Sequence, residues 1–403
     1  MLVSVAPLGS IDESNRISPL PIPVVSLASI DTASAQHLAS IACTLDAAFS
    51  NFGFVILSNV TVLSSPAALL SSARSFFGRS HEEKMLHNFG DYGNGKGGFT
   101  PMGQESASAT LETLEGEQQE QVKRTGKDRV ENYAFRSMHG DDGDDGDAGL
   151  HPPELYGEAK PYFDDMSELL RLLNRLTAMA VGVDDEFFQK FFWDEEGRDN
   201  NNYNNFAASP ANGNSLKIAH YPAVGAEKGE GEEECEQTDE GAGSGTRMPD
   251  GSLRYGAHTD CQTFTILLQD PTDHKDGFGG LEVFVSGAWV PVVPPTVECT
   301  VAGTHSFVVN CGDLTEIWTN GRWKSVLHRV SNPTSEEGWG HARISVPFFT
   351  GPKEDVLVEP IERAFEGAGG GGKGEGCEGG IKSRYKAVNA KDHLTMKLSL
   401  LNA

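Results

Sequence analysis

Tyr255-Gly-Ala-His258-Thr-Asp260 is the most informative stretch of the chain. Residues two apart in an extended segment point to the same side. His258 and Asp260 can therefore direct an imidazole nitrogen and a carboxylate oxygen at one ion. A histidine and an aspartate at this spacing also occur by chance in many chains, so the interpretation depends on further ligands elsewhere in the sequence.

His328 is the candidate third ligand. It lies in Ser325-Val-Leu-His328-Arg-Val, at the end of another predicted strand. Two histidines and one carboxylate on one face of an octahedron leave the opposite positions open, an arrangement that is typical of non-haem Fe(II) oxygenases. The sequence therefore predicts an iron site made by His258, Asp260 and His328.

Arg343-Ile-Ser345-Val-Pro347 follows His328 and adds a candidate anion site. Strand alternation places Arg343 and Ser345 on one face. A guanidinium beside a hydroxyl is a good fork for a carboxylate. Without the iron ligands upstream, the same arginine would be interpreted as one partner of a surface ion pair.

Short apolar segments around these ligands predict the fold class. They are separated by turns and insertions, with no helix-length periodicity between them, which favours an antiparallel sandwich or jelly roll. The predicted strands are Leu216–Tyr221, Phe264–Gln269, Leu281–Val285, Ala288–Pro291, Phe307–Asn310 and Ile344–Phe349.

The N-terminal half predicts an α/β region. Strands are expected at Ile22–Leu27 and Phe52–Leu57, and Gly90–Gly103 is interpreted as a long loop. The helical spacing of apolar residues predicts helices at Ser34–Phe49, Pro66–Phe77 and Pro161–Val181.

We divide the chain into five regions. These are an N-terminal region (20–138), an acidic insertion (139–150), a helical support (151–206), the jelly-roll core (214–352) and a C-terminal segment (353–403). Within them, the acidic stretch 226–250 and the Gly-rich stretch 366–380 have the composition of disordered loops.

The charge and cysteine content limit the partners and the compartment. The net charge is −26, and so acidic a chain repels nucleic-acid phosphates. The six cysteines form no CxxC pair, which fits a reducing compartment. The sequence has no apolar run of membrane-spanning length. We expect a monomeric cytoplasmic protein that acts on a small molecule without binding nucleic acid or membrane.

Several segments together resemble the 2-oxoglutarate/Fe(II) oxygenase superfamily, in the branch of isopenicillin N synthase and the plant gibberellin and flavonoid oxidases. The resemblance covers most of the chain. It is carried by Pro21–Leu27, Phe52–Val60, Phe76–Lys84, His220-Tyr221-Pro222, Asn310-Cys-Gly-Asp313, Trp318–Gly321, Ser325–Arg329 and Tyr385–Leu394. Ala219 departs from the pattern, because plant members often carry an asparagine there.

The resemblance implies a distorted double-stranded β-helix, a jelly roll with flanking helices. It implies Fe(II) held by His258, Asp260 and His328, with 2-oxoglutarate as co-substrate and O2 as oxidant. It assigns the distal carboxylate of 2-oxoglutarate to Arg343 and Ser345, with Tyr221 as a further hydroxyl donor. The implied reaction hydroxylates, desaturates or otherwise oxidises a small organic molecule and releases succinate and CO2.

The substrate pocket and the exact chemistry stay open at this point. Two alternatives remain: an oxidase like isopenicillin N synthase, which uses the Arg-x-Ser pair for its substrate, and a non-catalytic binding module on the same fold. Succinate formation separates the first alternative from the main interpretation, and metal content tests the second. The candidate pocket residues, each as readily a core residue, are Phe264, Leu281, Val283, Phe349, Tyr133 and Phe135.

Overall fold

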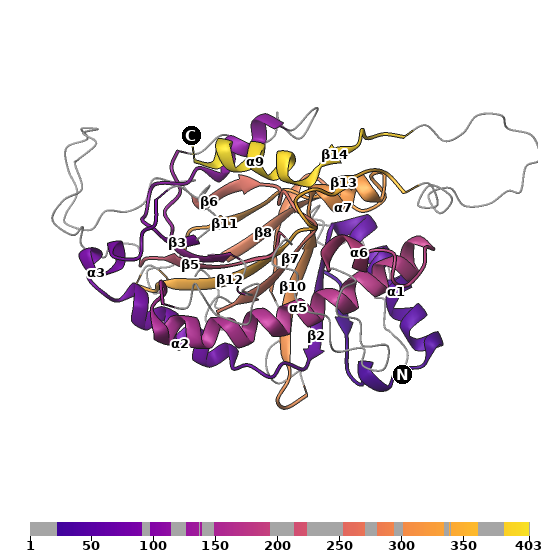
Figure 1. Cartoon of the computed structure of the whole chain (residues 1–403), viewed down its shortest axis with the longest axis horizontal. Coiled ribbons are helices and arrows are strands. Elements are labelled where there is room, and N and C mark those ends of the chain that lie inside the picture. The colour runs from indigo at the N-terminus through magenta and orange to yellow at the C-terminus, as the bar shows by residue number, and fades with distance from the viewer. Residues whose placement is uncertain are drawn as a thin grey trace, which may run out of the picture.

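Two β-sheets face each other at the centre of the molecule, with helices outside (Figure 1). The computed structural model describes residues 22–90, 97–113, 126–136, 138, 149–193, 213–223, 253–270, 280–293, 301–333, 338, 340–361 and 383–402. The acidic stretches 139–148 and 226–250 and the Gly-rich stretch 366–380 fall outside these residues, and the predicted boundaries between regions stay predictions.

The larger sheet has eight strands in the order β1-β2-β10-β7-β12-β5-β4-β3. β1 and β2 are parallel, and the other neighbours pair antiparallel. The C-terminal half supplies the four central strands, and strands of the N-terminal half lie at both edges: β1 and β2 at one, β4 and β3 at the other. The bounds are β1 Val24–Ser26, β2 Phe54–Val60, β3 Gly97–Thr100, β4 Glu131–Arg136, β5 Ser215–Tyr221, β7 Phe264–Gln269, β10 His305–Cys311 and β12 Arg343–Thr350.

The smaller sheet has four strands in the order β6-β11-β8-β9 and carries two of the candidate ligands. His258 ends β6 and His328 begins β11, and the two residues are register partners. The bounds are β6 Leu253–His258, β8 Gly280–Val285, β9 Ala288–Pro291 and β11 His328–Ser331; β13 Leu357–Val358 and β14 Val388–Asn389 form a separate pair.

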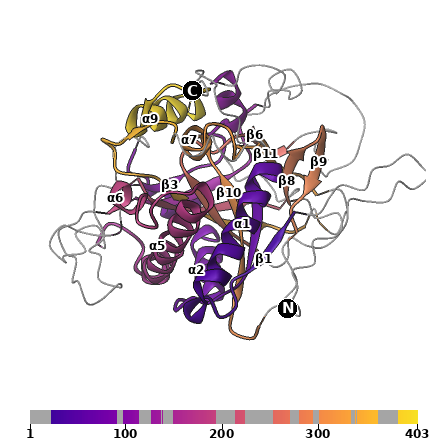
Figure 2. The same ribbon diagram turned by 90° about the vertical axis from the view of Figure 1, so that its right-hand side faces the viewer.

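Three helices pack together along the larger sheet: α1 (Ala35–Phe52), α2 (Pro66–Phe77) and α5 (Pro153–Val181) (Figures 1 and 2). Each buries one apolar stripe against the strands, because helical residues three and four apart share a face. In α1 this stripe includes Leu38, Ile41, Leu45 and Phe49. The Ser34 side chain accepts a hydrogen bond from the His37 N–H and so caps the start of that helix.

A second group of elements lies on the side of the molecule away from α2 (Figures 1 and 2). The C-terminal helix α9 (Ala390–Leu401) packs there against the 3-10 helix Ala107–Thr113. The short helices α7 (Asp313–Trp318), α3 (His81–Met85) and α6 (Gln189–Phe192), with the 3-10 turn Ile30–Thr32, complete the described elements.

The jelly roll with flanking helices is confirmed. Phe264–Gln269, Ala288–Pro291 and Pro66–Phe77 form the predicted elements with the predicted bounds. Three predictions about single elements are wrong. Gly97–Thr100 is a strand inside the segment interpreted as a loop, and α5 begins at Pro153, so that Pro161 lies inside it. His328 begins β11 and does not end a strand.

Glycine explains the missed strand. Gly97 has φ 74°, and a Cβ placed on it would lie 2.2 Å from the Ala134 carbonyl oxygen on the neighbouring strand. Only a residue without a side chain allows this approach. Gly97 thus makes the pairing of β3 with β4 possible, yet in the sequence alone a glycine at this position indicates a loop.

The remaining expectations about the fold concern cysteine pairing and membrane spans. Cys43, Cys261 and Cys311, the cysteines in the described part of the chain, are free thiols. Across the described residues, no helix combines the length and the apolar character that crossing a membrane requires.

Candidate metal centre

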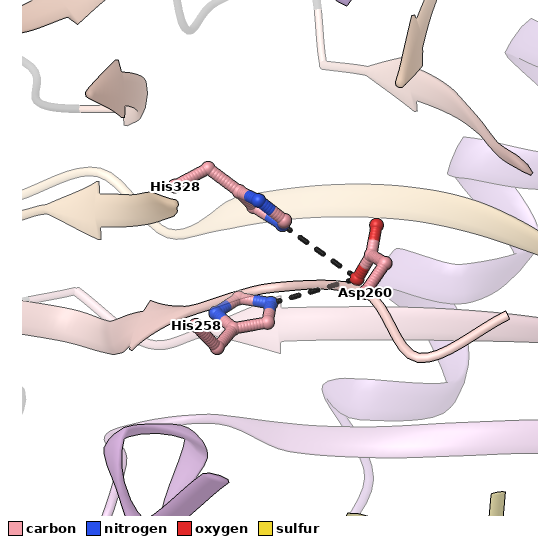
Figure 3. Close-up of side chains that lie close together, drawn as sticks. All are labelled: His258, Asp260 and His328. Atoms are coloured by element: carbon pink, nitrogen blue, oxygen red, sulfur yellow. Dashed lines mark ion pairs between the residues drawn. The ribbon is translucent and has the colours of Figure 1, made fainter. Parts of the chain in front are cut away.

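His258, Asp260 and His328 converge on one point between the two sheets (Figure 3). The Asp260 Oδ1 atom lies 3.7 Å from His258 Nε2 and 3.6 Å from His328 Nε2. The three candidate ligand atoms all lie within 4.8 Å of one another. Antiparallel pairing of β6 with β11 brings the two histidines together, and the turn after β6 carries Asp260 to them.

Backbone carbonyls orient both imidazole rings. His258 Nδ1 lies 2.9 Å from the Gly256 carbonyl oxygen, and His328 Nδ1 lies 3.1 Å from that of Val326. A hydrogen bond that Nδ1–H donates to each carbonyl leaves the Nε2 lone pair directed at the centre. Metal-binding histidines are commonly held by such a bond from the other ring nitrogen.

Two buried side chains hold the second oxygen of Asp260. The Thr265 hydroxyl donates to Asp260 Oδ2 at 2.5 Å, and Asn310 Nδ2 donates to the same atom at 2.6 Å. Oδ1 is thereby left facing the histidines. Sequence reasoning did not assign a role to Thr265 or Asn310, and the available signal was a polar residue within an otherwise apolar buried strand.

The electrostatics of the three groups suit a divalent cation. Burial lowers the pKa of His258 most, and the charge of the neighbouring His328 lowers it further, to about 3. The His258 imidazole is therefore neutral at ordinary pH. Burial alone would raise the pKa of Asp260 and lower that of His328. Their mutual attraction reverses both effects, so the pKa of Asp260 falls and that of His328 rises.

Two imidazoles and one carboxylate are the donor set that binds Fe(II) in non-haem oxygenases. Each donor is oriented by hydrogen bonds of its own. His258 and Asp260 also line a cavity, which leaves room beside them for further ligands. The residues present thus fit Fe(II).

Replacing Asn310 by Ala is expected to weaken Fe(II) binding by about 10- to 100-fold, the usual effect of removing a partner that orients a metal ligand. Asp260 loses one of the two bonds that fix its Oδ2 atom. Anaerobic titration with Fe(II) against a competing chelator measures the change. Thr304→Val is the control, because the Thr304 hydroxyl donates to the Val301 carbonyl in a turn. Equal Fe(II) affinities for the wild type, Asn310→Ala and Thr304→Val would contradict this role of Asn310.

Arg343, Ser345 and Tyr221 form a second buried polar group. Arg343 and Tyr221 are register partners on β12 and β5, and the guanidinium lies 4.9 Å from the centroid of the tyrosine ring. A side-chain hydrogen bond joins Ser345 to Tyr221. Burial raises the pKa of Tyr221, while the nearby Arg343 acts in the opposite direction.

This second group faces the smaller sheet. Tyr221 packs in one apolar cluster with Val330 of β11, and Tyr255 of β6 packs against the same cluster. The Tyr255 ring also contacts His258, with ring centroids 5.0 Å apart. Arg343 and Tyr221 are therefore linked through packed side chains to both strands that carry histidine ligands.

A cavity of about 800 Å³ opens from the metal centre toward the C-terminal helix. Its walls come from the 3-10 helix Ala107–Thr113, β4, β5, β6 with the turn after it, α7, the end of β12 with the residues after it, and one face of α9. The lining residues near the centre are Lys217, Tyr255, His258, Thr259, Asp260, Cys261 and Gln262; those on α9 are Ala390, Lys391, Leu394, Lys397, Leu398 and Leu401.

Lys217 and Tyr255 of the cavity wall share the buried carboxylate of Glu105. Lys217 Nζ lies 2.7 Å from both carboxylate oxygens of Glu105, and the Tyr255 hydroxyl donates to Glu105 at 3.0 Å. Glu105 precedes the 3-10 helix of the N-terminal half, far from β5 and β6 in sequence. Sequence reasoning gave no role to Lys217 or Glu105, because their proximity exists only in the folded chain.

The predicted pocket residues separate into two groups. Phe349 lines the cavity. Tyr133, Phe135 and Phe264 lie instead in the main apolar core, and Leu281 and Val283 lie in the core beside the smaller sheet. Tyr133, for instance, is fully buried and bonds to His151 Nδ1 at 2.7 Å. Pocket roles for the six residues stay predictions, and the geometry favours only Phe349.

A jelly roll that carries two histidines and one carboxylate at one point is the arrangement of the non-haem iron oxygenases. Two family models match the chain. Residues 229–352 match the 2OG-Fe(II) oxygenase superfamily, and residues 22–142 match the N-terminal region described as "non-haem dioxygenase in morphine synthesis". The chain belongs to the 2-oxoglutarate/Fe(II) oxygenase superfamily.

Curated relatives match parts of the chain. Gibberellin 20 oxidase 3 of Arabidopsis thaliana is 29% identical over 210 residues, which are 52% of this chain and 40% of the relative. Feruloyl CoA ortho-hydroxylase 1 of the same plant is 43% identical over 115 residues, 28% of this chain and 27% of the relative. The chain thus spans less than half the length of these relatives.

Solved structures match nearly the whole chain at the level of fold. A full-length protein of Neurospora crassa, solved in complex with alpha-KG, has a TM-score of 0.64 and 21% identity, covering 96% of this chain and 98% of that one. The dioxygenase for auxin oxidation in rice has a TM-score of 0.60 and 20% identity, covering 94% and 95%.

Proposed function

We propose that this protein is an Fe(II)- and 2-oxoglutarate-dependent dioxygenase that oxidises a small organic molecule with release of succinate and CO2. The convergence of His258 Nε2, His328 Nε2 and Asp260 Oδ1 on one point carries the proposal. Membership of the oxygenase superfamily supports the same assignment.

Each residue of the site then has a defined task. His258, Asp260 and His328 would hold Fe(II), and Thr265 and Asn310 keep the Asp260 carboxylate turned toward it. Arg343 with Ser345 and Tyr221 would bind the distal carboxylate of 2-oxoglutarate. When bound, Fe(II) would activate O2, and 2-oxoglutarate would give two of the four electrons that reduce O2, while the substrate gives the other two.

The cavity wall would orient the substrate. Its apolar part, including Phe349 and the leucines of α9, excludes water and contacts an apolar body. Its polar part, including Lys217 and the Tyr255 hydroxyl, is held at fixed positions by Glu105. A mostly apolar pocket with a few fixed polar groups is the usual form of a small-molecule site.

The remaining expectations are part of the same proposal. We propose a monomeric cytoplasmic enzyme that binds neither nucleic acid nor membrane. The net charge of −26 supports the absence of a nucleic-acid partner, because phosphates would be repelled. Light scattering in solution tests whether the protein is a monomer, and fractionation of cells tests whether it is cytoplasmic.

We expect succinate release that depends on both 2-oxoglutarate and Fe(II) when the protein is screened against a library of small organic molecules. Succinate separates the proposed reaction from that of an oxidase like isopenicillin N synthase, which does not consume 2-oxoglutarate. Oxidation of a substrate without succinate would establish the oxidase instead. A protein that binds neither Fe(II) nor 2-oxoglutarate would be a binding module. The comparisons do not favour these two alternatives.

A further inference from the structure

The C-terminal helix α9 buries a lysine beside the metal centre. Lys397 is 4% exposed, and its Nζ atom lies 2.9 Å from Asp313 Oδ2 and 3.3 Å from the Thr259 hydroxyl. Thr259 stands between the ligands His258 and Asp260. Lysine is almost never buried without a partner, and a buried ion pair contributes little net stability once desolvation is counted. The pair therefore calls for an explanation other than stability.

Asp313 connects this lysine to the loop that carries His328. Its Oδ1 atom accepts a hydrogen bond from the Ser325 hydroxyl at 2.7 Å, and its Oδ2 atom lies 3.2 Å from His393 Nε2 of α9. Burial alone would raise the pKa of Asp313, yet His393 and Lys397 lower it, so the carboxylate is charged. One carboxylate thus joins two residues of α9 to the approach to β11.

Glu316 makes a parallel connection one helical turn further along α7. The Ser325 N–H donates to Glu316 Oε2 at 2.7 Å, and the Tyr385 hydroxyl donates to Glu316 Oε1 at 2.6 Å. The Arg384 N–H also donates to Asn320 Oδ1 at 2.8 Å. The residues that lead into α9 are thereby fastened to the segment between α7 and β11.

The backbone of Asp313 contacts the candidate ligand Asp260 directly. Its N–H donates to the Asp260 carbonyl at 2.8 Å. Gly312 allows this approach, because a Cβ placed there would lie 2.3 Å from the Gln262 carbonyl oxygen and 2.9 Å from that of Asp260. Asp313 is therefore in contact with the turn that carries Asp260, with the loop before His328 and with α9.

We propose that Asp313 is a positioning residue that couples the docking of α9, through Lys397, to the placement of Asp260 and His328. The inference rests on the proposed function, because it concerns the same metal centre. The family match to the oxygenase core ends at residue 352, so α9 lies outside it. Leu394 and Leu398 of α9 also line the cavity, so the helix that would contact the substrate is the helix that is tied to the metal ligands.

Such coupling is reciprocal. If docked α9 improves the placement of the ligands, then a metal ion bound by those ligands stabilises the docked helix. Co(II) is a suitable probe, because its visible absorption reports the geometry of the ligands without turnover. We expect Co(II) to slow hydrogen exchange of α9 amides in the wild-type protein.

The test compares Lys397→Met with Lys391→Met. The control removes a lysine from the same helix whose partner, Glu354, is as exposed as Lys391 itself. For Lys397→Met we expect Co(II) affinity to fall by about 10- to 100-fold, as for other groups that support metal ligands, with altered visible bands and no protection of α9. Lys391→Met should bind Co(II) like the wild type, and Lys397→Arg should recover most of the lost affinity.

Ser325→Ala provides a milder variant, because it removes only the bond from Ser325 to Asp313. It should weaken Co(II) binding in the same direction, and its thermal unfolding shows whether the fold is kept. Wild-type affinity and wild-type bands in both Lys397→Met and Ser325→Ala would overturn the coupling while leaving the metal centre in place. A wild-type protein that binds no Co(II) at all would instead overturn the proposed function.

Discussion

Replacing His258, Asp260 or His328 by alanine is expected to abolish turnover and to remove nearly all bound Fe(II). Two protein ligands rarely hold Fe(II) in a facial geometry. In Asp260→Ala the two histidines also lose the carboxylate that lies within 3.7 Å of each Nε2 atom. Succinate release measures turnover, and a metal assay after anaerobic loading with Fe(II) measures occupancy.

His305→Ala is the matched control, because His305 lies at the start of β10, outside the triad. This variant should keep both its iron and its activity. Normal iron content and activity in any one of the three ligand variants would refute the assignment of that residue. Circular dichroism spectra of all four variants show whether a loss reflects the site or the fold.

Replacing Arg343 by Ala is expected to raise the concentration of 2-oxoglutarate needed for half-saturation very strongly, while Fe(II) binding changes little. Removing one partner of a buried charged pair costs on the order of 2–5 kcal/mol, or roughly 30- to several-thousand-fold in affinity. Arg343 is 2% exposed, so water replaces the lost guanidinium poorly. Arg343→Lys keeps the charge but not the bidentate geometry, so its effect should lie at the low end.

An anaerobic titration of the Fe(II) protein with 2-oxoglutarate, followed by its charge-transfer absorption, measures this affinity. Arg322→Lys is the control. Arg322 forms an ion pair with Asp46 at 2.5 Å and does not belong to the group formed by Arg343, Ser345 and Tyr221. Equal affinity in the wild type and Arg343→Ala would show that another group anchors the co-substrate. Absence of the band in the wild type would favour the oxidase.

The sequence alone was sufficient to predict which side chains meet at the centre of the candidate site. His258 and Asp260 are close in the chain, so local geometry restricts where they point, and the structure does bring them together with His328. Arg343 and Ser345 were placed on one face by strand alternation, and the structure places both beside Tyr221. Such patterns are readable because they depend on the conformation of a few neighbouring residues.

Tertiary structure decided what surrounds that centre. Thr265 and Asn310 meet at Asp260 only because β7 and β10 pair with each other. Glu105 and Lys217 come from distant segments, and the cavity is closed by a helix at the end of the chain. Tyr133 and Phe135, proposed for the pocket, lie in the core instead.

The physical reason is the range of the interactions involved. Alternation along a strand and the residue types of a metal site are local properties, and any extended chain with this sequence has them. Which side chain fills a space between sheets depends on strand register and on the packing of segments from both halves of the chain. The grouping of the candidate ligands was therefore predictable from sequence, whereas the cavity wall, the partners of Asp260 and the link from Lys397 to Asp313 became visible only in the folded protein.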